Sequence, residues 1–307
     1  MSIRVIFLGT AGSVPTPDRS LPAVLVKRGN EQLMFDCGEG VQRQMIRAKV
    51  GFHRKMKIFV SHLHGDHILG LPGMLQTMAL MDRQRTLEVY GPEGIERFLE
   101  CLRASLQFGL TFPVEIHEVY DDGVICEEKG YTVEAARSNH VVLGLAYAFV
   151  EKTRPGKFYP EKAIILGVPE GELWSKLQHG DTVELSNGQV ISPDTVMGTP
   201  RKGRKIVYTG DTRPFKGFAN FAVDADLVIH EATFDDTLSE KAESDGHSTP
   251  SQAAKEAKKA KAKKLVLTHI SARYPDSQLL LEQAQKVFKN TVVAEDFMEL
   301  ELPLPDS

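Results

Sequence analysis

The sequence has few cysteines, no long apolar run and no excess of basic residues. Its three cysteines, Cys37, Cys101 and Cys126, are odd in number and far apart, so they predict neither a closed disulfide framework nor a Cys-x-x-Cys metal clamp. No uninterrupted apolar run approaches the roughly 18 residues of a membrane-spanning helix. The first nine residues resemble a strand more than an export signal, and we therefore expect a cytoplasmic protein.

The charge balance argues mildly against a general nucleic-acid binder. The formal net charge is −4, whereas domains that bind nucleic acid usually carry a basic excess. Any affinity for RNA must therefore come from local basic patches. The length of 307 residues, with 42% hydrophobic and 25% charged residues, suits one large globular domain or a domain with an inserted element.

Short β-rich runs alternate with amphipathic segments, and the sequence contains no internal repeat. Helices are predicted at about 40–48, 70–81, 93–107, 250–263 and 277–289 from their apolar periodicity. Strands are predicted at 3–8, 23–27, 32–36, 57–61, 87–90, 114–119, 145–151, 206–209, 227–230, 265–268 and 292–294. This interleaving favours sheets covered by helices over an all-β design.

The segment 152–180 interrupts the alternation with a cluster of residues that break regular structure. These residues are Pro155, Gly156, Pro160, Gly167, Pro169 and Gly171. The composition indicates an excursion from the main body, and a plain surface loop is the alternative. The segment also contains several lysines, which are candidates for phosphate contacts.

The clearest chemical pattern is His62-Leu63-His64-Gly65-Asp66-His67, which follows an apolar strand and precedes a predicted helix. His62 and His64 are two residues apart, so in an extended loop their imidazoles can point the same way. Asp66 and His67 can turn toward a second position as the helix begins. Solvated loop histidines are the alternative, but clustered histidine and carboxylate are costly to hold together without a cation.

Three further candidate ligands, His140, Asp211 and His269, each lie at the end of a probable strand. Alone, His140 predicts an ordinary hydrogen-bonded histidine, and Asp211 predicts a turn carboxylate after Gly210. Their shared placement makes them candidates together. Seven ligands exceed what one tetrahedral ion can use, so we expect two metals that share a carboxylate. Zinc suits these ligands best, although manganese or iron can occupy them too.

The His-x-His-x-Asp-His motif, followed by a distant His, Asp and His, resembles the metallo-β-lactamase superfamily. This resemblance implies an α/β fold of the four-layer αβ/βα sandwich type, with two zinc ions per subunit at one edge. It also implies how the ligands divide: His62, His64 and His140 on one ion, Asp66, His67 and His269 on the other, and Asp211 as the bridge.

Further motifs, spread from residue 3 to about 275, are similar to the ribonuclease Z family within that superfamily. They are Phe7-Leu8-Gly9-Thr10, Phe35-Asp36-Cys37-Gly38-Glu39-Gly40, Tyr208-Thr209-Gly210-Asp211-Thr212-Arg213-Pro214, His230-Glu231-Ala232-Thr233, His247-Ser248-Thr249 and Thr268-His269-Ile270-Ser271 with Arg273-Tyr274. The resemblance implies an endoribonuclease that cleaves the 3′ trailer from precursor tRNA after the discriminator nucleotide. The products would be a 3′-hydroxyl on the tRNA and a 5′-phosphate on the trailer.

The resemblance also implies the organisation of the chain. Residues 1–307 are expected to form one metallo-β-lactamase domain, in which 152–180 is an inserted flexible arm that binds tRNA. The length is similar to the short form of the family, which implies a homodimer. Candidate tRNA contacts in the arm are Lys152, Arg154, Lys157 and Lys162.

Hydrolysis of a phosphodiester needs an activated water, stabilisation of charge, and a proton for the leaving oxygen. We expect Asp66 to act as ligand and as helper in deprotonating the water. The resemblance implies that His247 is the acid and that Glu231 orients it and keeps it protonated. Alternatively His247 only precedes a helix, since Thr249 and Pro250 are N-terminal capping signals. The two roles are compatible, because a helix start also presents N–H groups to a phosphate.

Other readings remain open at this point. The lysines between 255 and 264 lie opposite an alanine stripe and indicate a solvated helix face, whereas the basic run 201–205 lies near the metal edge, where it can contact phosphate. The remaining histidines, among them His230, are interpreted as structural or surface residues. One functional alternative is a phosphodiesterase or arylsulfatase-like hydrolase of small esters. Another is an RNA-binding relative without turnover.

Overall fold

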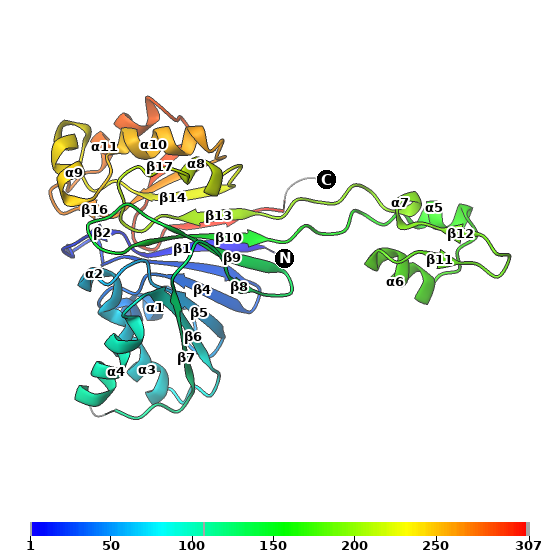
Figure 1. The fold of residues 1–307 in the computed structure, drawn as a ribbon, viewed down its shortest axis with the longest axis horizontal. Helices are drawn as coiled ribbons and strands as arrows, with labels where there is room; N and C mark the ends of the chain where they lie inside the picture. Colours follow the sequence, from blue (N-terminus) through cyan, green and yellow to red (C-terminus); the bar gives the residue numbers. More distant parts are fainter. Residues whose placement is uncertain (1, 107, 305–307) are drawn as a thin grey trace. The chain divides into compact units, whose positions relative to one another are not determined.

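A computed structural model describes residues 2–106 and 108–304 of the chain (Figure 1). The chain divides into two compact units. The first is built from residues 2–150 and 205–303, and the second is built on residues 151–204. All the candidate metal ligands belong to the first unit, so that unit is the one that positions the metal site.

The first sheet of this unit has seven strands, which supply the framework for half of the site. They lie in the order β18 (Glu299–Leu302), β1 (Ile3–Gly9), β3 (Ala23–Arg28), β4 (Glu31–Phe35), β5 (Lys55–Phe59), β6 (Leu87–Pro92) and β7 (Val114–Val119). Strands β4 to β7 pair in parallel, so their carboxyl ends lie at one edge of the sheet.

The second sheet also has seven strands. They lie in the order β17 (Thr291–Val293), β15 (Leu265–Thr268), β14 (Leu227–Glu231), β13 (Lys205–Tyr208), β10 (Leu145–Glu151), β9 (Tyr131–Arg137) and β8 (Gly123–Glu127). Here β13, β14, β15 and β17 are the parallel members. A short parallel pair, β2 (Ala11–Gly12) with β16 (Ile270–Ser271), joins the turn after β1 to the turn after β15.

Successive side chains along a strand point to opposite faces of the sheet, and this alternation separates the layers of the unit. In β1, Val5 and Phe7 enter a core made almost entirely of strand residues from both sheets, whereas Ile6 and Leu8 enter a second core shared with helices. The helices on that side are α1 (Val41–Arg47), α3 (Gly70–Leu80) and α4 (Ile95–Leu106). On the outer face of the second sheet, a third core holds α8 (Phe218–Phe221), α10 (Pro250–Lys259) and α11 (Gln278–Gln285). The expected four-layer αβ/βα sandwich is confirmed (Figure 1).

Helix α10 shows how local sequence fixes one of these layers. The Thr249 hydroxyl accepts the backbone N–H of Gln252, the Gln252 side chain accepts the N–H of Thr249, and Pro250 occupies the first turn. Ala253 and Ala257 are buried against the sheet, while the lysines of the helix are exposed. The predicted solvated face is therefore confirmed. The cap also fixes the backbone just before α10, where His247 lies.

Each predicted strand and helix is present, three strands with the predicted ends and the other elements with ends shifted by a few residues, and in the first unit the structure adds strands β2, β8, β9, β16 and β18. Strand β9 escapes prediction because Glu134, Ala135 and Ala136 have weak β propensity, although Tyr131 and Val133 do alternate into the core. Short helices were also missed, among them α2 (Gly65–Ile68), which begins inside the metal motif, and α9 (Ser239–Asp245).

The second unit is folded around its own apolar core. Its elements are α5 (Pro160–Ile165), α6 (Glu172–His179), the hairpin β11 (Val183–Glu184) with β12 (Val190–Ile191), and α7 (Pro193–Val196). Ala163, Leu177 and Val196 are buried in that core, and Trp174 packs against it. The segment 152–180 is thus the first part of a longer folded unit that continues to residue 204, and it is not a plain surface loop.

A buried ion pair joins the two ends of this unit. Arg204 donates from Nε to Glu151 Oε2 at 2.9 Å and from Nη2 to Oε1 at 2.8 Å, and both side chains are almost fully buried. The Glu151 backbone N–H also donates to the Arg204 carbonyl. This bidentate geometry fixes the separation of the two chain ends.

Two exclusions drawn from composition can be compared with the structure. Cys37 and Cys126 are buried and Cys101 is exposed, and all three are free thiols. Burial raises the pKa of the Cys37 thiol far above its usual range, so it stays protonated and inert. Among the described residues, no helix combines the length and the apolar character that crossing a bilayer requires.

We predict that Glu151→Ala destabilises the second unit, because it leaves the Arg204 guanidinium buried without its carboxylate. The free energy of unfolding should fall by about 3–5 kcal/mol. Trp174 is the single tryptophan of the chain, so its fluorescence in a urea titration reports on this unit. The control is Glu172→Ala, which removes an exposed partner of Lys176 and should leave the midpoint unchanged. Equal midpoints for both variants and the parent would contradict the role of the pair.

Candidate metal centre

The candidate ligands converge at one edge of the first unit, where parallel strands of both sheets end. His62 to His67 follow β5 and lead into α2, Asp211 follows β13, and His269 follows β15. His140 comes from the turn between β9 and β10. Since the carboxyl ends of parallel strands meet at one edge, residues distant in sequence become neighbours there.

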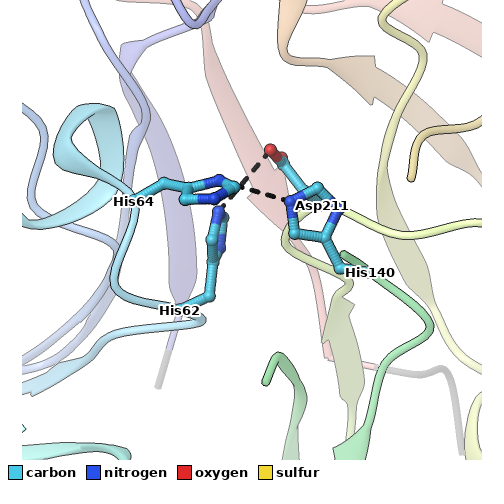
Figure 2. A group of neighbouring side chains, drawn as sticks. All are labelled: His62, His64, His140 and Asp211. Carbon is cyan, nitrogen blue, oxygen red and sulfur yellow. Dashed lines mark hydrogen bonds and ion pairs between the residues drawn. The ribbon is translucent and has the colours of Figure 1, made fainter. Parts of the chain in front are cut away.

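The first cluster contains His62, His64, His140 and Asp211, with one possible ligand atom from each lying within 4.8 Å of the others (Figure 2). His140 Nε2 lies 3.3 Å from His64 Nδ1, and His62 Nε2 lies 3.7 Å from Asp211 Oδ2. The imidazole rings meet edge to face around a common centre, so their nitrogens face one another rather than solvent.

The second cluster contains Asp66, His67 and His269. The Nε2 atoms of His67 and His269 lie 3.3 Å apart, and they lie 3.4 and 3.3 Å from Asp66 Oδ2. Asp211 Oδ2 is 3.3 Å from each of the same two nitrogens. Asp211 therefore contacts both clusters, which is the position of a bridging ligand.

Two buried polar atoms without a hydrogen-bond partner indicate that this arrangement fits cations. His62 Nε2 and Asp211 Oδ1 are buried and have no hydrogen-bond partner, although unpaired buried polar atoms are costly. Burial lowers the pKa of His62 well below its usual range, so the ring is neutral and its nitrogen can act as a ligand. A donor set of imidazole nitrogens and carboxylate oxygens fits divalent transition metals, and zinc in particular.

Neighbouring groups hold the second nitrogen of several of these rings. His140 Nδ1 donates to the Gly246 carbonyl at 2.7 Å, and His269 Nδ1 donates to the Thr233 hydroxyl at 2.8 Å. Each bond leaves Nε2 turned toward the clusters, as hydrogen-bonded metal ligands usually are. Gly246 adopts a positive φ of 86°, and a Cβ there would lie 2.7 Å from His140 Nδ1.

The buried carboxylate of Asp36 is the most connected of these supports. It accepts His67 Nδ1–H at 2.6 Å, the Ser61 N–H at 2.6 Å and hydroxyl at 2.8 Å, and the Tyr208 hydroxyl at 2.6 Å. Sequence reasoning noticed the Phe35-Asp36 block only as a family likeness and missed this role. The available signal was a carboxylate directly after a buried strand.

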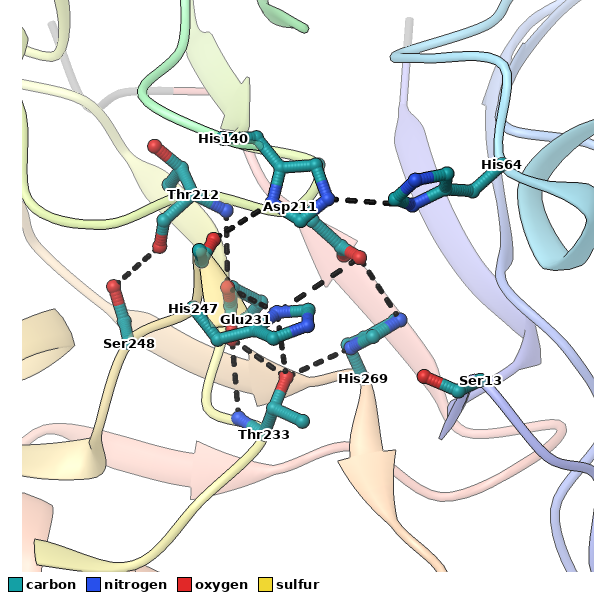
Figure 3. A network of polar contacts seen from close by, with 12 residues as sticks. Ser13, His64, His140, Asp211, Thr212, Glu231, Thr233, His247, Ser248 and His269 are labelled. Atoms are coloured by element: carbon teal, nitrogen blue, oxygen red, sulfur yellow. Dashed lines mark hydrogen bonds and ion pairs between the residues drawn. The ribbon is translucent and has the colours of Figure 1, made fainter. Parts of the chain in front are cut away.

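His247 lies beside the second cluster in a network centred on Glu231 (Figure 3). His247 Nδ1 donates to Glu231 Oε1 at 2.9 Å, and the carboxylate also accepts the backbone N–H groups of Thr212 and Thr233. Burial alone would lower the pKa of His247, but the charge and hydrogen bond of Glu231 outweigh it and raise that pKa to about 9. The imidazolium form is therefore favoured at neutral pH.

The geometry also permits a different role for His247. Together with Asp211 and His269 it forms a third group of possible ligands, and its ring stacks on His269 with centroids 5.4 Å apart. Its Nδ1 already donates to Glu231, which leaves Nε2 either to bind a metal or to donate a proton. Metal content after substitution distinguishes the two roles.

Comparison with known proteins places the chain. The family model described as "Anti-Pycsar protein Apyc1" matches residues 3–153, and the one described as "Beta-lactamase superfamily domain" matches residues 177–270. Ribonuclease Z of Methanosarcina acetivorans is 49% identical over 302 residues, 98% of both chains. Ribonuclease Z of Archaeoglobus fulgidus is 45% identical over 313 residues, which cover both chains fully. The chain belongs to the ribonuclease Z family.

Solved structures agree with this membership. The crystal structure of human tRNase Z, short form, is similar to this chain, with a TM-score of 0.73 and 30% sequence identity. The match covers 98% of this chain and 100% of the human one. The metallo-β-lactamase fold protein YhfI of Bacillus subtilis has a TM-score of 0.70 at 22% identity and shows the fold alone. The expected family and fold class are both confirmed.

We predict that Asp36→Asn weakens metal binding by this ribonuclease Z family member by about 10- to 100-fold, because His67 loses its orienting carboxylate. Zinc affinity of the metal-stripped protein is measured by competition with a chelator. Asp226→Asn is the matched control, since Asp226 binds the Lys205 N–H and the Lys263 ammonium at the amino end of β14. An unchanged affinity in Asp36→Asn would remove this support from the site.

Proposed function

We propose that this chain is a zinc-dependent endoribonuclease that removes the 3′ trailer from precursor tRNA. Cleavage would follow the discriminator nucleotide and leave a 3′-hydroxyl on the tRNA and a 5′-phosphate on the trailer. The observation that carries the proposal is full-length identity of 42–49% to several proteins called Ribonuclease Z. We further propose that it works as a homodimer, as the likeness to the short form implies. We also propose that it acts in the cytoplasm, as the sequence led us to expect.

Seven residues would hold two zinc ions. One ion would take His62, His64 and His140, the other Asp66, His67 and His269, with Asp211 shared. When bound, the ions would lower the pKa of a water and stabilise charge on the phosphoryl oxygens. The buried, unpartnered atoms of His62 and Asp211 support this assignment.

Asp66 is suited to orienting the attacking water. Its Oδ2 accepts the backbone N–H of Ser13 at 3.0 Å, which fixes the carboxylate in the site. Burial would raise the pKa of Asp66, but the adjacent imidazoles of His269 and His67 outweigh it and hold that pKa far below the usual range. The carboxylate therefore stays ionised and accepts a hydrogen bond from the water, which directs the oxygen lone pair at the phosphorus.

His247 is suited to protonating the leaving 3′ oxygen. Its pKa of about 9 keeps it charged at neutral pH, and Glu231 holds Nδ1 so that Nε2–H is free to donate. General acid catalysis of this kind contributes about 10²–10⁴ in rate. The carboxylate that raises the pKa is itself held by the N–H groups of Thr212 and Thr233, so the orientation of His247 is fixed before substrate binds.

We predict that His247→Ala retains zinc and loses about 10²–10⁴ in turnover of precursor tRNA. Metal stoichiometry and single-turnover cleavage are measured on the same sample. Loss of zinc in proportion to activity would make His247 a ligand instead of an acid. Turnover equal to that of the parent would refute both roles.

The second unit supplies the proposed grip on tRNA. The ammonium groups of Lys162 and Lys157 lie 4.6 and 5.9 Å from the centre of the Tyr159 ring, so both cations contact the same aromatic ring. Arg154 lines a cavity of about 300 Å³, and its Nε and Nη2 atoms are buried without a hydrogen-bond partner. Two buried guanidinium nitrogens without a partner favour an anion such as a phosphate oxygen. Lys152, at the start of the segment, would add to this basic surface.

We predict that replacing residues 153–202 with a short Gly-Ser linker abolishes cleavage of precursor tRNA and spares hydrolysis of bis(p-nitrophenyl) phosphate. The replacement keeps the Glu151–Arg204 pair, so the chain still leaves and rejoins the first unit at one place. As a charge control, Lys255→Ala with Lys258→Ala removes two exposed cations from α10 and should change neither reaction. Equal loss on both substrates would refute a unit devoted to tRNA, and small-ester hydrolysis without any tRNA cleavage by the parent would favour the phosphodiesterase alternative.

A further inference from the structure

A cavity of about 270 Å³ opens beside His247. Three loops of the first unit line it. The turn after β2 contributes Ser13, whose N–H holds Asp66, the turn after β14 contributes Phe234, and the turn after β16 contributes Arg273. The cavity therefore adjoins both the residue that orients the water and the residue that protonates the leaving oxygen.

Phe234 is a buried residue in the wall of this cavity, and two cationic side chains lie over its ring. The Arg273 guanidinium lies 5.2 Å from the ring centre, and the Lys241 ammonium lies 5.4 Å from it. The Lys241 charge is already paired with Asp245 at 2.7 Å. Arg273 is exposed, and its guanidinium forms no ion pair with any described residue. Arg273 is thus the cation of this cavity whose charge is left for a ligand.

A pair of hydrogen bonds holds the two loops in register. The Tyr274 hydroxyl donates to Asp235 Oδ2 at 2.7 Å and accepts the Asp235 N–H at 2.8 Å. Because Tyr274 follows Arg273 and Asp235 follows Phe234, these bonds keep the guanidinium on the ring. An arginine held in this way loses less side-chain entropy when it binds a ligand.

The geometry of a stacked arginine selects its ligand. A guanidinium that lies on an aromatic face uses its face for stacking, while its N–H donors point outward in its own plane. These in-plane donors match the oxygens of a phosphate, which arginine binds with two parallel hydrogen bonds. The cavity also adjoins the reacting groups, so a phosphate bound here belongs to a nucleotide close to the scissile bond.

The position of His247 identifies which nucleotide that is. In the proposed function His247 protonates the 3′ oxygen of the last retained nucleotide, so that nucleotide lies against His247. His247 is also one of the residues that line the cavity. We propose that this cavity receives the last retained nucleotide of the RNA and that Arg273 binds the phosphate on its 5′ side. This inference rests on the proposed function and makes Arg273 a substrate-positioning residue.

The test pairs a change in the protein with a change in the RNA. Arg273→Ala should lower kcat/KM for precursor tRNA by about 10- to 100-fold, the range for a hydrogen bond to a charged group. An uncharged methylphosphonate at the phosphate 5′ to the discriminator nucleotide should cost the parent enzyme the same factor. The same substitution in the RNA should cost Arg273→Ala nothing further, because the contact is already gone.

Salt dependence gives a second measure of the same contact. Loss of one phosphate contact should reduce the slope of log kcat/KM against log salt concentration by about 0.7, and Arg273→Lys should restore that slope. The matched control is Lys289→Ala, which removes an exposed cation just before β17, at the opposite end of the parallel strands. It should change neither the slope nor the rate.

Each outcome has a defined meaning. Independent losses from Arg273→Ala and the methylphosphonate, in an enzyme that cleaves unmodified precursor tRNA, would overturn the Arg273 assignment and leave the proposed function standing. Equal loss of bis(p-nitrophenyl) phosphate hydrolysis in Arg273→Ala would overturn it too, because the residue would then be structural. A lowered rate with an unchanged salt slope would indicate stacking on a base and contradict the phosphate contact. Failure of the parent to cleave precursor tRNA would overturn the proposed function itself.

Discussion

The carboxylate of Asp211 is the point on which the site depends. It lies within 3.3 to 3.7 Å of imidazole nitrogens that come from both clusters, and its other oxygen is buried with no partner. Burial would raise its pKa, but the nearby His269 and His67 hold that pKa well below the usual range. Such a concentration of desolvated ligand atoms is stable only with positive charge among them, which bound metal ions would supply.

The groups behind the ligands connect the site to the core of the sandwich. Asp36 ends a strand of the first sheet and accepts the hydroxyl of Tyr208, which ends β13 in the second. The same carboxylate orients His67. The carboxylate that aligns a ligand therefore also links the two sheets, so the geometry of the site and the packing of the layers are set together.

The sequence was sufficient to predict that the candidate ligands lie together, and the family resemblance was sufficient to predict the four layers. His62 to His67 are clustered in sequence, and Asp211 and His269 each follow a predicted strand, whereas β9, the strand before His140, was not predicted. The supports were not predictable, since Asp36 meets His67 only after the chain folds and Thr233 meets His269 across two strands. The extent of the second unit was also missed, because its core depends on β12 and α7, which follow the Gly- and Pro-rich stretch.

The Glu151–Arg204 pair has an evolutionary consequence. It lets the polypeptide depart from the sandwich and return to it at a single anchored point, with β10 and β13 pairing directly beneath. What lies between the anchors can lengthen, shorten or be exchanged without disturbing strand register in the body. The second unit, to which the proposed grip on tRNA belongs, can therefore diversify independently of the metal site in chains built on this plan.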